Sequence, residues 1–405
     1  MASHTTEAPI EELVARLDDP AFYAGDPFPT YARLRAEAPV AWNPSLGYWV
    51  ASRHSEVLEV SKRHDLFCAR KGILTFEIGV EYPTPPTMMH TDPPEHTRYR
   101  RLVLPGFSPP QMRALEPRVR ERAASLVDRI APGVPFDVVE TIAIEYPLMI
   151  IAELLGIPDD DWQRFHEWSE ASIPQDDGRG EDERAAARAE MQHFLMDATL
   201  ARRGDPRDDL VSVLANVEVD GESLTDDELL MFLNQLLVAG NETVRNTISG
   251  GMWALAERPD QWRRLVDDRS LVPSAVEEWL RWTTAVISFM RTATVDTQLG
   301  GQAIRAGDPV LMLYASANRD EDVFGPNADD FDVGRDPNPH VAFGFGAHFC
   351  IGAALARLEA RVLLEELLER FTTLGPAGEV ERLHSGVIAG VTAAPLVLGV
   401  DEPHT

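Results

Sequence analysis

The 405-residue sequence contains only two cysteines, Cys68 and Cys350. Their number and separation exclude a disulfide framework and the paired spacing of a structural zinc site. So little cysteine is typical of a protein that works in a reducing compartment, and we therefore expect a cytoplasmic protein.

Long apolar runs are also absent. The N-terminal residues 1–12 have no basic patch followed by an apolar stretch, so we expect no signal peptide. The most apolar short stretch, residues 147–158, contains Glu153 and is too short to cross a bilayer. The sequence thus predicts a protein without a membrane partner.

Basic charge is scarce, because 37 Lys and Arg residues face 66 Asp and Glu residues, a net charge of −29. This balance argues against nucleic acid and anionic membranes as partners. Hydrophobic residues make up 44% of the chain, which is enough for a large core. No segment has the composition of a linker, so we expect a single domain over residues 1–405.

Helical patterns dominate, and the longest covers residues 226–258. Thr225 and Glu228 have the spacing of a capping box, and Pro259 is expected to end the helix. At ~1.5 Å per residue it would be roughly 50 Å long. Residues 231–240 are apolar nearly all round, which is typical of a buried helix that forms one wall of a cavity.

Short strand-like runs occur near residues 40–50, 293–304 and 380–397. We therefore expect a mainly α fold with a small β-rich region. Long irregular segments are expected at residues 71–94, 173–182 and 318–342, and such segments often act as lids or binding loops.

The most informative segment is Phe-Gly-Phe-Gly-Ala-His-Phe-Cys-Ile-Gly, residues 343–352. It places Cys350 in a glycine-rich loop just before a predicted helix over residues 353–370. Unpaired N–H groups and the dipole at a helix N-terminus lower the pKa of a thiol. An anionic sulfur held in this way suits an axial iron ligand, which favours O–O cleavage. The alternative is a buried, chemically inert cysteine.

The spacing of Phe343, Gly346, Cys350 and Gly352 resembles the haem-binding loop of the haem-thiolate monooxygenases, the cytochrome P450 superfamily. The resemblance covers nearly the whole chain and implies the cytochrome P450 fold. It implies haem b (iron protoporphyrin IX) between the long central helix and the helix after the cysteine loop, with Cys350 as the metal ligand. The residues that it places against the haem include Ala239, Phe343, Gly344, His348, Cys350 and Gly352.

The predicted central helix contains Ala-Gly-Asn-Glu-Thr at residues 239–243. Small side chains leave room for a small molecule, and a threonine hydroxyl can bond the carbonyl one turn back and bend the axis. An acid beside an alcohol can pass protons to a bound oxygen species. The resemblance implies that Thr243 holds that species or its water and that Glu242 supplies protons. The alternative is that Glu242 pairs only with an arginine and Thr243 only packs.

A haem has two carboxylates, which need cationic or hydrogen-bonding partners. His96 and Arg100 are four residues apart and therefore share a helix face. Arginine is well shaped for paired contacts to a carboxylate. The resemblance implies that His96, Arg100, Arg291 and His348 bind the propionates.

Glu278 and Arg281 are three residues apart on one helical face. Taken alone, such a pair is usually a solvated surface pair of small energetic weight. The resemblance instead implies a buried network with Arg335 that locks the fold and supports the haem loop.

Two pairs of arginines, Arg98 with Arg101 and Arg357 with Arg361, have helical spacing near the cysteine loop. A basic patch on an acidic protein would steer a small acidic redox partner. The resemblance implies a ferredoxin or flavodoxin with its reductase. Ordinary surface arginines are the alternative.

The resemblance places substrate contacts at apolar residues, namely Leu236, Ala239, Val286, Ile287 and Val387. An apolar lining favours a hydrophobic small molecule. Sterols, fatty acids, terpenoids and other secondary metabolites are the candidate classes.

The expected function is therefore a monooxygenase that inserts one oxygen atom from O2 by hydroxylation or epoxidation. Its electrons would come from NAD(P)H through a ferredoxin. A peroxide-driven or non-oxygenating haem-thiolate enzyme is one alternative, and a haem-binding protein without catalytic activity is another.

Overall fold

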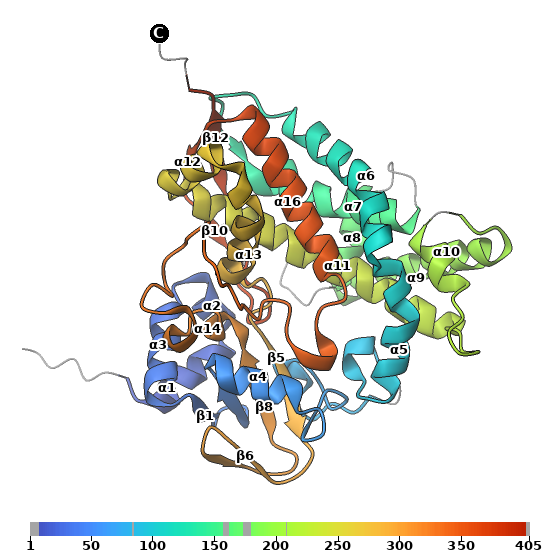
Figure 1. Ribbon diagram of the computed structural model, residues 1–405. Helices are drawn as coiled ribbons and strands as arrows, with labels where there is room; N and C mark the ends of the chain where they lie inside the picture. The colour runs from blue at the N-terminus through green and yellow to red at the C-terminus, as the bar shows by residue number, and fades with distance from the viewer. Residues whose placement is uncertain (1–7, 83–84, 157–161, 173–179, 208, 402–405) are drawn as a thin grey trace, which may run out of the picture.

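The computed structural model describes residues 8–82, 85–156, 162–172, 180–207 and 209–401. Figure 1 shows a large region of packed helices and, below it, a smaller region in which the N-terminal helices surround a sheet. This arrangement confirms the mainly α fold with a small β-rich region. Among the described residues, none of the helices combines the length and the apolar character that crossing a bilayer requires.

The longer helices are α3 (Phe28–Glu37), α4 (His54–Lys62), α5 (Glu95–Val103), α6 (Pro109–Val127), α7 (Glu145–Leu155), α8 (Trp162–Ser172), α9 (Glu181–Gly204), α11 (Asp226–Ala256), α12 (Pro259–Asp267), α13 (Val272–Thr283) and α16 (Ala353–Arg370). The shorter helices are α1 (Ile10–Ala15), α2 (Pro20–Ala24), α10 (Leu210–Ala215), α14 (Tyr314–Ala317) and α15 (Glu321–Phe324). The strands are β1 (Val40–Asn43), β2 (Tyr48–Ala51), β3 (Phe67–Cys68), β4 (Phe136–Asp137), β5 (Ser288–Ala293), β6 (Thr297–Leu299), β7 (Gln302–Ile304), β8 (Pro309–Leu313), β9 (Thr373–Pro376), β10 (Glu381–Arg382), β11 (Val391–Ala393) and β12 (Pro395–Gly399).

The central helix α11 crosses the helical region (Figure 1) and packs against α7, α8, α9, α13 and α16. Its N-terminus has the predicted capping box. The Thr225 hydroxyl accepts the Glu228 N–H at 3.2 Å, and the Glu228 carboxylate accepts the Thr225 N–H at 2.9 Å. The helix ends at Ala256, two residues before the predicted end, because the residue that precedes Pro259 takes a non-helical backbone.

The largest sheet has the strand order β1-β2-β8-β5-β3, in which β2 and β8 are parallel and the other neighbours are antiparallel. Side chains on a strand alternate between faces. Leu311 and Leu313 of β8 pack with the N-terminal helices α1 and α3, whereas Val310 and Met312 pack with α4. The sheet therefore lies between two small cores.

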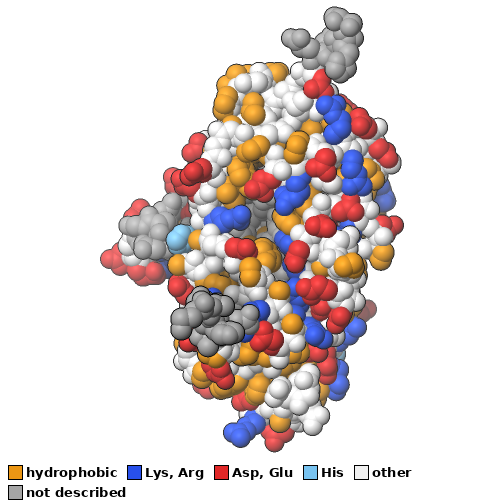
Figure 2. Space-filling view, turned by 90° about the vertical axis from the view of Figure 1, so that its left-hand side faces the viewer, with side chains coloured by type: hydrophobic (Ala, Val, Ile, Leu, Met, Phe, Trp, Pro, Cys, Tyr) orange, Lys and Arg blue, Asp and Glu red, His pale blue; other side chains and the backbone are white. Residues whose placement is uncertain are grey.

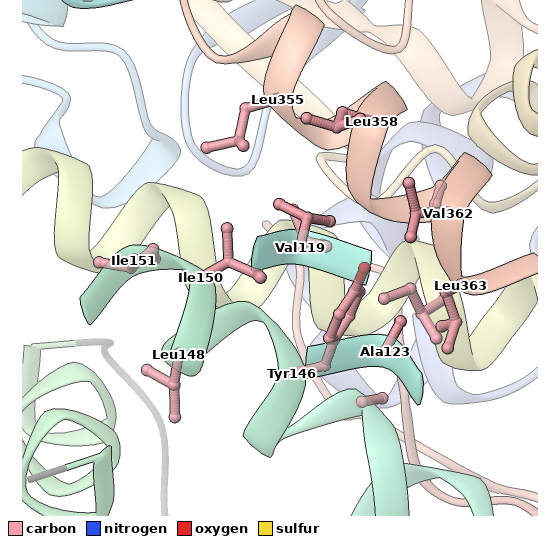
Figure 3. Packing of buried hydrophobic residues seen from close by; sticks show 14 of the residues in the cluster. Val119, Ala123, Tyr146, Leu148, Ile150, Ile151, Leu355, Leu358, Val362 and Leu363 are labelled. Carbon is pink, nitrogen blue, oxygen red and sulfur yellow. The ribbon is translucent and has the colours of Figure 1, made fainter. Parts of the chain in front are cut away.

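The main core joins α6, α7 and α16. Figure 3 shows Val119 and Ala123 of α6, Tyr146 of α7, and Leu358 and Val362 of α16 within one cluster. Because α16 begins three residues after Cys350, this packing fixes the position of the cysteine loop.

The predicted loops at residues 71–94 and 318–342 are irregular, apart from short 3₁₀ turns in the first and α15 in the second. Most of the loop predicted at residues 173–182 lies outside the described residues.

Candidate functional site

The loop that carries Cys350 folds back on itself, since the Cys350 N–H donates to the Phe343 carbonyl at 2.9 Å. Gly344 and Gly346 have φ values of +67° and +71°. A Cβ at Gly346 would lie 2.5 Å from the Ser61 carbonyl oxygen, so only glycine fits where the loop meets α4. The loop therefore presents the cysteine at the start of α16.

The pKa of the Cys350 thiol differs from the expectation. Burial is the largest influence and raises its pKa, while the Gly352 and Ala353 N–H groups and two nearby arginines lower it. The predicted helix N-terminal effect is present, but the prediction of a lowered pKa is wrong for the protein alone. A coordinating metal ion deprotonates a thiol outright, so the donor fits a metal-bound thiolate.

Cys350 is accessible to solvent although protein surrounds it. Ala239 is likewise accessible, although it lies in the middle of α11 between turns that are largely buried. The loop around Cys350 is half-buried to exposed, and Ala239 is an exposed residue on a largely buried helix, so both positions are open to a ligand. The resemblance places the haem between them.

The structure brings together the four residues expected to bind propionates. The His96 and His348 rings lie 4.0 Å apart between centroids, and the Arg100 guanidinium donates to the Phe349 carbonyl at 2.7 Å. Arg291 of β5 is buried and donates to the Met290 carbonyl at 2.6 Å.

Burial lowers the pKa of both arginines. It also lowers the pKa of His96 to about 4 and that of His348 to about 2, and the neighbouring arginines add to both shifts. Within the part of the chain that the structure describes, no carboxylate forms an ion pair with any of the four. The two arginines are charged and lack counter-ions among the described residues, which is costly for groups out of solvent, while the neutral histidine rings can still donate hydrogen bonds. This cluster therefore fits a ligand with two carboxylates.

Thr243 lies one turn after Ala239, and its hydroxyl donates to the Ala239 carbonyl at 2.7 Å. Its oxygen therefore keeps lone pairs that can accept a hydrogen bond. Gly240, in contrast, packs against α7, because a Cβ there would lie 3.0 Å from Ile151. The expectation that Gly240 leaves room for a ligand is wrong, because this glycine leaves room for a neighbouring helix.

Glu242 is buried and belongs to a polar cluster. One carboxylate oxygen accepts from Arg245 at 2.7 Å and from Asn246 at 3.2 Å, and the other has no partner. Arg245 also binds Glu170 of α8 at 3.0 Å. Burial raises the pKa of Glu242, and Glu170 raises it further, whereas Arg245 and Asn246 lower it. The ion pair of the alternative interpretation is present, and it leaves one oxygen of Glu242 available.

Sequence reasoning missed Arg245 and Glu170. Arg245 could have been found, because it lies one helical turn after Glu242. Glu170 could not, since only the packing of α8 on α11 brings it close.

Glu278, Arg281 and Arg335 form a buried network. The Glu278 carboxylate accepts two hydrogen bonds from Arg281 at 2.7 Å and others from Arg335 at 3.2 and 3.3 Å. Both arginines also donate to the Asp330 carbonyl, so the network joins α13 to the segment that leads to the cysteine loop.

One of the residues expected to contact the substrate, Ile287, lies in a different environment from the others. Leu236 and Ala239 lie on α11, and Val286 forms a bridge with Ile388 beside Val387. Ile287 donates its N–H to the Val387 carbonyl at 2.9 Å, but its side chain packs in the core beneath the N-terminal helices. Ile287 is therefore placed as a core residue.

The arginines expected to form a free basic patch are paired with acids. Arg98 binds Glu228 and Glu222, Arg101 binds Asp220 and Glu222, Arg357 binds Glu277, and Arg361 binds Glu116 and Glu365. On the face in Figure 2, basic side chains likewise lie among acidic ones. The four arginines therefore carry local counter-charges, which the expected patch did not include.

Comparisons with known proteins agree with this geometry. A family model described as Cytochrome P450 matches residues 181–395. The steroid C26-monooxygenase of Rhodococcus jostii is 38% identical over 390 residues, 92% of this chain and 82% of that protein. The linalool 8-monooxygenase of Pseudomonas putida is 36% identical over 388 residues, 92% of this chain and 95% of that protein.

Solved structures show the same similarity. CYP108D1 from Novosphingobium aromaticivorans superposes with a TM-score of 0.87 at 33% identity, covering 97% of this chain and 99% of that one. CYP109E1 from Bacillus megaterium, in complex with testosterone, gives a TM-score of 0.84 at 32% identity, covering 93% and 100%.

Proposed function

The chain belongs to the cytochrome P450 family and is a haem-thiolate monooxygenase of hydrophobic substrates, and we propose the following roles for its residues. Cys350 would supply the sulfur that binds the iron of haem b. Arg100, Arg291, His96 and His348 bind the two propionates. One observation carries this assignment: an accessible cysteine just before α16 lies near a cluster of four buried or half-buried nitrogen side chains, none of which forms an ion pair with a carboxylate of the described residues.

When bound, the haem supplies the binding and reductive activation of O2. The protein contributes the environment. Burial raises the pKa of the Cys350 thiol, and a bound haem iron would hold this sulfur as a thiolate. Phe343 and Phe349 of the same loop pack against each other with ring centroids 6.1 Å apart.

Thr243 and Glu242 handle protons. The Thr243 hydroxyl already donates to the Ala239 carbonyl, so its oxygen can accept a hydrogen bond from a water molecule beside α11. Burial raises the pKa of Glu242, which favours a proton on its unpartnered oxygen, and Arg245 opposes this shift, so the carboxyl group can both accept and donate a proton.

The substrate is a hydrophobic small molecule, for which the steroid and terpenoid relatives suggest two classes. We assign substrate contacts to Leu236, Ala239, Val286 and Val387. Electrons come from NAD(P)H through a ferredoxin or flavodoxin with its reductase, in the cytoplasm, to a single-domain enzyme.

The electron donor needs a surface near the cysteine loop. A groove of about 420 Å³ lies between α6, α13 and α16, and its lining includes Met112, Val276, Ala354 and Leu358. Its edge includes Arg113, which forms no ion pair with any of the described residues. We place the donor here, because Ala354 is only four residues from Cys350.

The decisive test supplies the purified haem protein with NADPH, a ferredoxin, its reductase and linalool or testosterone. We expect NADPH and O2 consumption coupled to a product that has gained one oxygen atom. Oxidation that proceeds with hydrogen peroxide but never with the electron-transfer chain would contradict the proposal.

A further inference from the structure

The carboxamide of Gln235 joins the central helix to the loop at residues 71–94. Gln235 lies on α11 one turn before Ala239, and its Oε1 accepts the Met88 backbone N–H at 3.0 Å. Four residues along a helix turn the side chain by only about 40°, so Gln235 borders the face that carries Ala239.

This bond fixes which end of the carboxamide faces away from the loop. Only the oxygen can accept an N–H, so the Nε2 group, with two N–H donors, takes the opposite position. Among the described residues, none accepts a hydrogen bond from Nε2. The neighbouring Asn234 has a carbonyl oxygen that is buried without a partner in the described part of the chain, whereas Gln235 has no such buried atom. The amide nitrogen is therefore within reach of a ligand.

The loop that binds Gln235 is itself held in place by several hydrogen bonds. The Met88 carbonyl accepts the Thr91 hydroxyl at 2.7 Å. The buried Glu77 carboxylate accepts the Ile73 N–H at 2.7 Å, the Tyr82 hydroxyl at 2.8 Å and a His90 ring nitrogen at 3.0 Å. Because the loop is held in place, the Nε2 group of Gln235 is held in one orientation. A donor with a fixed orientation can discriminate between ligands.

We propose that Gln235 is a specificity-determining residue whose Nε2 group donates to an acceptor oxygen of the substrate. The proposal rests on the monooxygenase function given above. Thr243 lies eight residues further along α11, about 12 Å along the axis at ~1.5 Å per residue. The substrate is therefore an apolar molecule with a hydroxyl or carbonyl oxygen on the order of 10 Å from the carbon that is oxidised.

Two isosteric probes test this assignment. 2-Undecanone carries an acceptor oxygen, and 2-methyl-1-undecene replaces that oxygen with a methylene group of similar size. The dissociation constant of each is measured from the shift in the haem spin state. One neutral hydrogen bond should make the ketone bind about fivefold tighter to the parent protein.

Two substitutions separate the donor from the tie to the loop. Gln235→Leu removes both, and the ketone preference should disappear. Gln235→Glu, at a pH where the carboxyl is ionised, still accepts the Met88 N–H but offers no donor. It should keep slow exchange of the Met88 amide hydrogen and lose the ketone preference. Asn234→Leu is the matched control and should keep the preference.

Equal binding of the two probes to the parent protein would overturn the proposal, as would a ketone preference that survives in Gln235→Leu. Either result would leave the spectrum of the reduced, carbon monoxide-bound protein and the NADPH-driven turnover unchanged. Failure of those two measurements would instead reject the proposed function.

Discussion

Replacing Glu278 with glutamine should destabilise the protein more than any surface change of the same kind. The carboxylate is fully buried and is the shared partner of Arg281 and Arg335. Glutamine keeps one acceptor oxygen but removes the charge, so two buried guanidinium groups lose their common counter-ion. Breaking a buried ion pair from one side costs about 3–5 kcal/mol.

The expected change in melting temperature follows from the chain length. At about 2.1 cal/mol/K per residue, 405 residues give an unfolding entropy of roughly 0.85 kcal/mol/K. The loss therefore corresponds to a Tm lower by about 4–6 °C, measured by far-UV circular dichroism. Because the network holds the segment before the cysteine loop, Glu278→Gln should also be purified with little haem.

Glu37→Gln is the matched control, because Glu37 pairs with Arg33 at the surface, where the carboxylate side chain is 45% exposed. Exposed pairs contribute little, so this variant should melt with the parent protein and carry full haem. A Glu278→Gln protein that does the same would refute the buried-network argument.

Two further predictions concern single groups inside the protein. Thr243→Ala should retain haem but divert reducing equivalents to peroxide, whereas Thr247→Ala, one turn further along α11, should stay coupled. The ratio of product formed to NADPH consumed measures the coupling. An unchanged ratio in Thr243→Ala would reject the proton role of this residue. Burial raises the pKa of Glu359 well above its ordinary value, so the folded state holds this proton more tightly than the unfolded chain. The resulting stability is complete below the ordinary carboxyl pKa and is lost as the pH rises towards the folded-state pKa, so Glu359→Gln should gain stability relative to the parent as the pH rises from about 5 to 9. Denaturant midpoints across that range provide the measurement, and a difference independent of pH would show that Glu359 does not titrate in this way.

Local signals in the sequence predicted the parts of the fold that depend on local chemistry. The capping box at Thr225 and the bounds of α16 follow from side-chain types at fixed spacing, and both are confirmed. The run at residues 293–304 is less regular than expected, because Ala293 ends β5 and two short strands follow it. The parallel pairing of β2 with β8 has no local signal, since some 250 residues separate them.

The chemistry of the site was predictable in its residue types and less so in its energetics. The spacing around Cys350 identified the loop, but the direction of its thiol pKa depends on how much protein surrounds the sulfur. Gly240 has the composition of a ligand-facing residue, yet only the packing of α7 shows that it faces Ile151. Apart from Glu365, which shares α16 with Arg361, the acids that pair the surface arginines lie on other elements, for example Glu228 opposite Arg98 at 2.8 Å.

The proposed function depends most directly on iron ligation by the sulfur of Cys350. The spectrum of the reduced, carbon monoxide-bound protein tests this ligation, with Cys350→Ser as the comparison. We predict the red-shifted Soret band of a thiolate ligand in the parent protein and its loss in the variant. A band at the position typical of imidazole ligation, unchanged by Cys350→Ser, would contradict it.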